Sequence, residues 1–367
     1  MNFNTAATVD NDISVAGSGV GGLGAIRLFG ADVTVNGLLT LTGNTALDPG
    51  SEQTLTLAGG VTDGNNDYTL TNLWYGTIAL TGAASNWTGG VTTVLPGAIS
   101  ITDQTSIGSG KITLADGGAL RVTGAATLAN EVELTGNATI ETAAAVTMSG
   151  AFSGGEQTLT KSGAGTLTLS NTGNEAGLNG GVTVSEGTLA VAADDALMGG
   201  TVTLLNGGTL SLTGATDINN VITLGNGGGT INAAAAATVS GGIGGSGSLT
   251  KTGSQLLTVS GNNGYTGATF INAGPVLITH ANALGSTVGA TTVADGATLR
   301  IGNGLTVAEN LTISGSGVSS GIGAVKINEG SGSAELTGDI TLADDADIGA
   351  YNTGDTTMAQ LSGDLAR

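Results

Sequence analysis

Residues Gly118–Gly124 read GALRVTG, and the pattern returns about ninety residues later as GTLSLTG at Gly208–Gly214, then as ATLRIG at Ala297–Gly302. Leu159–Ser170 is echoed in the same way by Leu249–Ser260. Self-similarity at a fixed period of this length is typical of solenoids, propellers and arrays, in which stacked repeats share one core. The recurrence therefore predicts a repeat protein and not an ordinary globular enzyme.

The local pattern within each copy has a period of two. Apolar residues alternate with Thr, Ser or Ala in short runs that are bounded by Gly, Asn or Asp, which is the signature of β-strands and turns. One turn of about 20 to 25 residues would hold two or three strands, and about four turns would make one block. Parallel stacking of such coils places Leu120, Leu210 and Leu299 inward, and Ala233–Ala237 is expected to be a strand. We predict an all-β, parallel β-solenoid that runs through residues 1–367 as one continuous domain.

Composition excludes several classes of partner. The 367 residues carry a formal net charge of −20 and no Cys. Nucleic acid and anionic membranes require basic surfaces, so neither is an expected partner, and the lack of Cys excludes disulfides and thiolate metal sites. Residues 1–17 lack the basic and apolar segments of a signal peptide. No apolar run reaches the length of a membrane helix, so direct membrane insertion is not expected.

Several phrases resemble the passenger-associated strand repeat of bacterial autotransporters. They are GSLTKTG at Gly247–Gly253, LTVSGNNGYTG at Leu257–Gly267, INAG at Ile271–Gly274 and ANALG at Ala281–Gly285. The copy that begins at Leu159 keeps the first phrase but has Leu178 where Tyr265 stands. The resemblance implies a right-handed parallel β-helix exported to the bacterial surface, where it would serve as a stalk, spacer or adhesin. It also implies that the signal peptide and membrane anchor lie outside this chain.

The two ends of the sequence share the same phase. Residues 8–20 resemble residues 306–318, and neither end shows a recognisable capping repeat. We therefore expect a segment of a longer chain, or a subunit that self-associates through the solenoid ends. An extracellular filament or sheath built in this way is the alternative function.

Catalytic chemistry has little support in the sequence. The acidic clusters are Asp63, Asn65 and Asp67, and then Asp344, Asp345 and Asp347, while His280 is the single histidine. A glycan-degrading β-helix, the minor alternative, would need paired carboxylates beside basic or metal partners. The Asp63–Asp67 segment has the first spacing of a calcium loop but lacks its later glycine and glutamate, so we expect an Asx-rich turn. We predict no catalytic residue, no cofactor and no metal site.

Two adjacent aromatic residues are the least expected feature of the repeat. Trp74 and Tyr75 stand where sister copies carry a small turn, Ser162–Ala164, which predicts a loop. Exposed aromatic side chains stack on sugars or pack in contacts with other chains. Trp74, Tyr75 and Trp87 are therefore the candidate surface-contact residues, with cell-surface glycans or neighbouring chains as partners. The alternative is that Trp74 and Tyr75 pack over the loop that contains Trp87.

Overall fold

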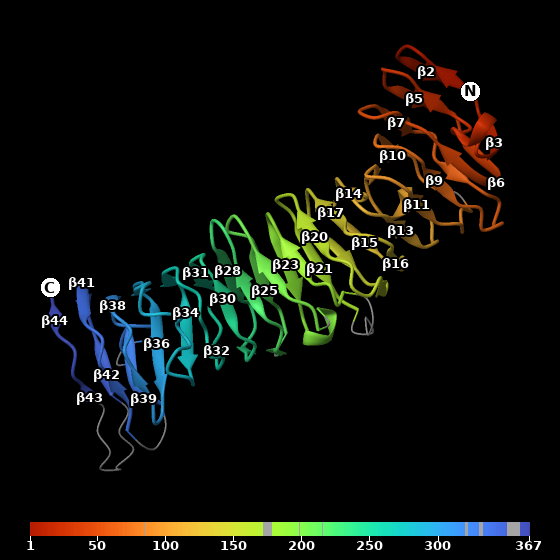
Figure 1. Ribbon diagram of the computed structural model, residues 1–367. Helices are drawn as coiled ribbons and strands as arrows, with labels where there is room; N and C mark the ends of the chain where they lie inside the picture. Colours follow the sequence, from red (N-terminus) through yellow and green to blue (C-terminus); the bar gives the residue numbers. More distant parts are fainter. Residues whose placement is uncertain are drawn as a thin grey trace. The chain divides into compact units, whose positions relative to one another are not determined.

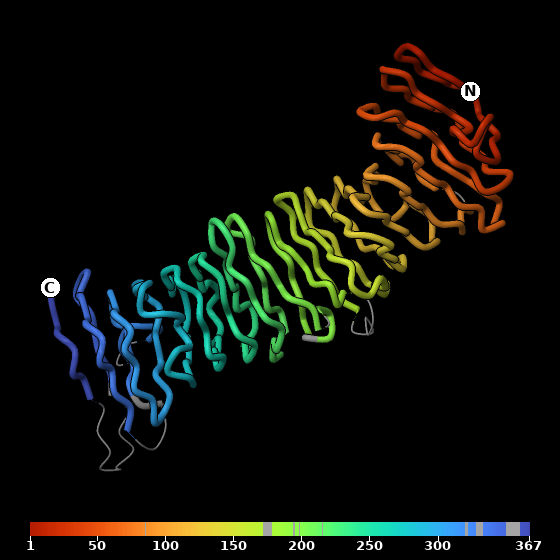
Figure 2. Tube along the Cα trace, viewed as in Figure 1, coloured from red at the N-terminus to blue at the C-terminus, as the bar shows by residue number. Residues whose placement is uncertain are grey.

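The computed structural model describes residues 1–84, 86–171, 178–197, 199–214, 216–319, 322–329, 333–350 and 360–367. These residues form parallel β-solenoid coils, about 16 turns in all, as the repeated coils of the Cα trace show (Figure 2). Within the described ranges, helix is limited to short 3-10 turns at Val20–Gly22, Gln104–Ser106 and Asp194–Ala196. The prediction of an all-β solenoid is confirmed.

The chain divides into two compact units, Met1–Val182 and Thr183–Arg367, and the strand β22 (Val182–Val184) spans the boundary. One continuous domain over the whole chain stays a prediction. No helix among the described residues is both long and apolar enough to cross a membrane.

Unit 1 has two long sheets and a shorter third one (Figure 1). The first sheet contains, in order, β2 (Ala7–Val9), β5 (Val33–Val35), β7 (Thr54–Leu57), β10 (Thr77–Leu80), β12 (Ala98–Ile101), β14 (Ala119–Val122), β17 (Ala138–Thr142) and β20 (Leu159–Ser162). The second contains β3 (Ile13–Gly17), β6 (Leu39–Leu47), β9 (Leu70–Asn72), β11 (Val91–Thr93), β13 (Ile112–Leu114), β16 (Val132–Leu134) and β19 (Phe152–Ser153), with β8 (Val61–Thr62) paired to β6. The third contains β15 (Ala126–Leu128), β18 (Val146–Met148) and β21 (Thr166–Leu169), and β1 (Asn2–Phe3) pairs with β4 (Arg27–Leu28).

Unit 2 continues the same construction. One sheet contains β23 (Thr188–Val191), β25 (Thr209–Leu212), β28 (Gly229–Ala233), β31 (Leu249–Thr252), β33 (Thr269–Ile271), β35 (Thr291–Val293), β38 (Leu311–Gly315), β41 (Ile340–Ala346) and β44 (Leu365–Ala366). The next contains β26 (Asp217–Ile218), β29 (Ala237–Val239), β32 (Leu257–Val259), β34 (Gly274–Ile278), β36 (Ala297–Gly302), β39 (Val325–Glu329) and β42 (Ile348–Ala350). The remaining strands are β24 (Val202–Leu204), β27 (Ile222–Leu224) and β30 (Ile243–Gly245) in one sheet, and β37 (Thr306–Val307), β40 (Glu335–Leu336) and β43 (Gln360–Leu361) in another.

Columns of stacked aliphatic side chains build the core. In unit 1, Ile78 pairs with Ile99, Ile99 with Leu120, and Leu120 with Ile140, and all four side chains are fully buried. Burial of one such side chain stabilises the fold by about 1.5 to 3 kcal/mol. The inward orientation predicted for Leu120, and that for Leu210 and Leu299 in unit 2, is confirmed because all three are buried.

The ninety-residue block contains the expected number of about four turns, and a short remainder. In unit 2, successive turns carry the chain from Leu210 to Ile231, Lys251, Ile271 and Val293 in one sheet, at 20 to 22 residues a turn. Six further residues reach Leu299, which lies on β36 in the adjacent sheet. From one copy of the motif to the next, the chain therefore makes about four turns and then moves on to the adjacent sheet. Successive copies of the motif occupy successive faces and do not stack on one another.

The expected strand at Ala233–Ala237 is wrong. Strand β28 ends at Ala233, and β29 begins at Ala237. Between them the chain bends, and the amide of Ala235 bonds to the carbonyl oxygen of Leu212, one turn below. A coil of about 21 residues that serves three faces must turn between strands, and small side chains fit such a corner.

Candidate functional site

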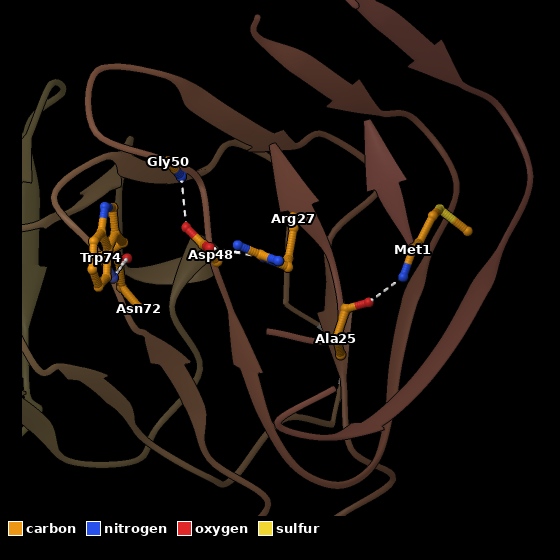
Figure 3. Close-up of polar contacts among 7 residues, drawn as sticks. All are labelled: Met1, Ala25, Arg27, Asp48, Gly50, Asn72 and Trp74. Carbon is orange, nitrogen blue, oxygen red and sulfur yellow. Dashed lines mark hydrogen bonds and ion pairs between the residues drawn. The ribbon is translucent and has the colours of Figure 1, made fainter. Parts of the chain in front are cut away.

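Trp74 and Tyr75 lie in the loop that follows β9, and Figure 3 shows the side chain of Trp74. Their side chains are 45% and 48% exposed. The two rings meet edge to face, with 5.5 Å between their centroids and 84° between their planes. Tyr75 therefore supports Trp74 from one side and leaves both side chains accessible to a ligand.

Asn72 fixes the position of this loop. Its side chain is buried at the end of β9, and its Nδ2 donates to the carbonyl oxygens of Gly76 (2.9 Å) and Ala98 (3.1 Å). The backbone N–H of Trp74 in turn donates to Asn72 Oδ1 at 3.2 Å (Figure 3). A buried amide with all these partners holds the backbone of Trp74 rigidly.

Trp87 is a correction to the candidate surface-contact residues. Its side chain is 2% exposed, and its Nε1–H donates to the carbonyl oxygen of Tyr68 at 3.0 Å. The indole also packs against Gly108, where an added Cβ would come within 3.3 Å of the ring. An indole with its one donor satisfied inside the protein belongs to the core and offers no contact surface.

Trp74 borders a groove with a volume of about 520 Å³, which we call the Trp74 groove. Its lining includes Leu23, Arg27, Phe29, Asp48, Gln53 and Trp74. Asp48 Oδ2 pairs with Arg27 Nε at 3.0 Å, and Asp48 Oδ1 accepts the backbone N–H of Gly50 at 2.9 Å (Figure 3). The Arg27 guanidinium lies 4.6 Å from the centre of the Phe29 ring. The ion pair thus contacts the Phe29 ring and shares the groove with Trp74.

The Asp63 cluster is a structural turn. Asp63 accepts the backbone N–H groups of Asn65, Tyr68, Thr88 and Gly89 at 2.9 to 3.3 Å. Burial of the carboxyl raises its pKa, but the four donors outweigh burial, so that the pKa of Asp63 is lowered from its ordinary value. Asn65 and Asp67 adopt positive φ angles of 64° and 57° in this turn. The expected Asx-rich turn is observed.

The second acidic cluster lies in an open groove of about 740 Å³ in unit 2. Asp344, Asp345 and Asp347 line it, together with Asp295 from two turns earlier, which the sequence did not associate with them. Asp345 forms an exposed ion pair with Arg367 at 2.6 Å. Among the described residues, no group of His, Asp and Glu side chains has the arrangement of a metal site.

His280 has a local role in a turn. Its Nδ1 accepts the backbone N–H of Asn282 at 3.1 Å. This histidine therefore closes the corner after β34, and the structure brings it to neither acidic cluster.

Two buried lysines were missed because the Lys-Ser-Gly and Lys-Thr-Gly phrases read as turns. Lys161 pairs with Ile140 and Lys251 with Ile231, so both occupy inward positions, with 0% and 1% of their surface exposed. Lys251 Nζ donates to the carbonyl oxygens of Gly253 (2.7 Å), Gln255 (2.9 Å) and Ala273 (2.7 Å). Burial lowers the pKa of Lys251 to about 8. The period-two alternation with Leu249 was the signal that could have revealed its inward direction.

Unit 2 also contains a buried polar ladder. Tyr265 Oη contacts Thr269 Oγ1 at 2.6 Å, Thr269 pairs with Thr291 one turn later, and Thr291 Oγ1 donates to Glu309 Oε1 at 2.9 Å. Burial raises the pKa of Glu309 to about 7, against the opposing effect of the Thr291 hydrogen bond. Burial also raises the pKa of Tyr265. The ladder satisfies polar groups in the core.

The buried lysine strands coincide with a known repeat. Residues 159–191 and 249–278 match the passenger-associated-transport-repeat family, and the two segments begin at the first residues of β20 and β31. Two segments of the chain are therefore similar to passenger-associated repeats. It is also 37% identical over 127 residues to the "Adhesin BmaC autotransporter" of Brucella suis biovar 1 (strain 1330), a match that covers 31% of this chain and 4% of that protein. No solved structure matches the chain significantly. The resemblance seen in the sequence is confirmed.

Proposed function

We propose that this autotransporter-passenger-like surface protein is a non-enzymatic adhesive stalk. The observation that carries the proposal is the repeat itself, since passenger-associated repeats fall on regular, parallel coils of the solenoid. The similarity to a protein whose name contains "adhesin" supports the adhesive part. The match to passenger-associated repeats supports a location at the bacterial surface.

The architecture suits a mechanical role. Each strand inside a sheet pairs with a strand on both sides, and apolar columns run from coil to coil. Stability in such an array is spread over many neighbour contacts. A net charge of −20 makes the sides of neighbouring molecules repel one another. The two acidic clusters support this role, since Asp63 is used in a turn and Asp345 in a surface ion pair.

Surface display tests the proposal directly. The chain is placed between a signal peptide and an outer-membrane anchor in a non-adherent laboratory bacterium, and adhesion to epithelial monolayers is counted. Cells that display the chain should adhere at least several-fold better than cells that display the anchor alone. Protease added to intact cells should remove the displayed chain and abolish this additional adhesion. Cells that display the chain at the surface but adhere no better than this control would refute the adhesive role.

A further inference from the structure

We propose that the Trp74 groove binds a neutral hexopyranose residue of a glycan. This inference names a ligand class for the adhesive function proposed above and rests on it. The groove lies within unit 1, and its walls come from the segments around Arg27, Asp48 and Trp74.

Exposed apolar side chains gather in this groove. Leu23, Phe29 and Trp74 line it, and they are 51%, 43% and 45% exposed. Aromatic residues make up 3% of the chain, and Phe270 is the other exposed aromatic besides Tyr75 in the described ranges. Exposed apolar surface that is concentrated at one place marks a binding site. The C–H groups on one face of a pyranose ring are slightly positive and fit the negative face of an aromatic ring.

The polar groups beside Trp74 match sugar hydroxyls. Asp48 is 8% exposed, and each of its oxygens accepts one hydrogen bond, from Arg27 Nε and from Gly50. Each oxygen therefore keeps a further acceptor site. Within the described part of the chain, neither Nη group of Arg27 has a hydrogen-bond acceptor. A hydroxyl both donates and accepts, so two neighbouring hydroxyls of one sugar can bond to Asp48 and to Arg27 together.

Charge and size favour a neutral saccharide. The charges of Arg27 and Asp48 balance each other, and the net charge of −20 repels anionic ligands at long range. The volume of about 520 Å³ lies in the range of small-ligand sites, about 300 to 1,000 Å³. A protein partner would instead require about 800 Å² of buried surface on each side. The hydrogen bonds of Asn72 and Gly50 hold the site in shape before any ligand binds.

The experiment uses the purified full chain and the methyl glycosides of D-glucose, D-galactose and D-mannose. Saturation-transfer NMR and tryptophan fluorescence measure binding, and Trp74 is the exposed reporter because Trp87 is buried. We expect at least one glycoside to bind with a Kd on the order of 1 mM. Trp74→Ala should weaken it at least tenfold, and Arg27→Lys should weaken it because the planar fork is lost. The matched control Phe270→Ala, an exposed aromatic in unit 2, should bind normally.

Four results would overturn the proposal. They are no binding of any of the three glycosides, equal binding by Trp74→Ala, loss of binding in the control Phe270→Ala, and a preference for the anionic sugars glucuronic acid and sialyllactose. Circular dichroism melting confirms that the variants are folded. Adhesion of cells that display the chain distinguishes failure of the groove proposal from failure of the proposed adhesive role. If none of the three glycosides binds but displayed cells adhere, the groove proposal fails and adhesion stands. If the groove binds a glycoside but displayed cells do not adhere, the groove proposal stands and the adhesive role fails.

Discussion

Glu309→Gln should remove a pH dependence of stability that the parent protein shows between pH 4.5 and 7. Burial raises the pKa of Glu309 from 4.5 to about 7, and its side chain is 3% exposed. In this range the folded state keeps a proton that the unfolded state has released. The stabilising effect is therefore complete below pH 4.5 and is lost as the pH rises through about 7. At 1.36 kcal/mol for each pH unit, the loss is about 3 kcal/mol.

The assay is urea unfolding at several pH values from 4 to 8.5, together with hydrogen exchange of the amides in β35 and β38. A glutamine resembles the protonated carboxyl and can still accept from Thr291 Oγ1. The variant should match the parent at pH 4 and exceed its stability by up to about 3 kcal/mol at pH 8. Glu52→Gln, at an exposed corner, is the matched control and should follow the parent throughout. A constant difference between Glu309→Gln and the parent at every pH would refute the reasoning.

Four further predictions concern the core, the surface and the ends. Leu210→Asp should lower the stability by about 3 to 5 kcal/mol, because an unpaired charge enters an apolar column; an unchanged melting temperature would contradict it. Lys251→Met should cost about 3 kcal/mol, since three buried carbonyl oxygens lose their donor, whereas Lys111→Met, which breaks an exposed pair with Glu133, should cost less than about 1 kcal/mol; equal losses would argue against the buried role. Polygalacturonate, alginate and plant or bacterial glycans should not be cleaved; turnover that Asp63→Asn with Asp67→Asn, or Asp344→Asn with Asp345→Asn, abolishes would show an enzyme. We also propose that the chain self-associates through the solenoid ends and that salt promotes this by screening its charge; a monomer by sedimentation at high concentration and high salt would disprove it.

The candidate site was only partly predictable. Trp74 and Tyr75 stood out because they replace a small turn, and the structure places both on an exposed loop. Trp87 was grouped with them by residue type, yet it is buried against Gly108. The polar half of the Trp74 groove was missed. Arg27 and Asp48 lie 21 residues apart, one turn of the coil, and neither has a local motif that marks it.

The sequence by itself determined most of the strands, their inward apolar residues and the repeat family, because these depend on period-two alternation and on recurrence, which are local properties of the chain. The tertiary structure alone decided which face each copy occupies. Turns of 20 to 22 residues do not divide a block of about ninety evenly, so Leu210 and Leu299 come to lie in adjacent sheets. It also decided that Lys251 points inward. A lysine is charged in isolation, and only the three carbonyl oxygens that converge from two turns make its burial favourable.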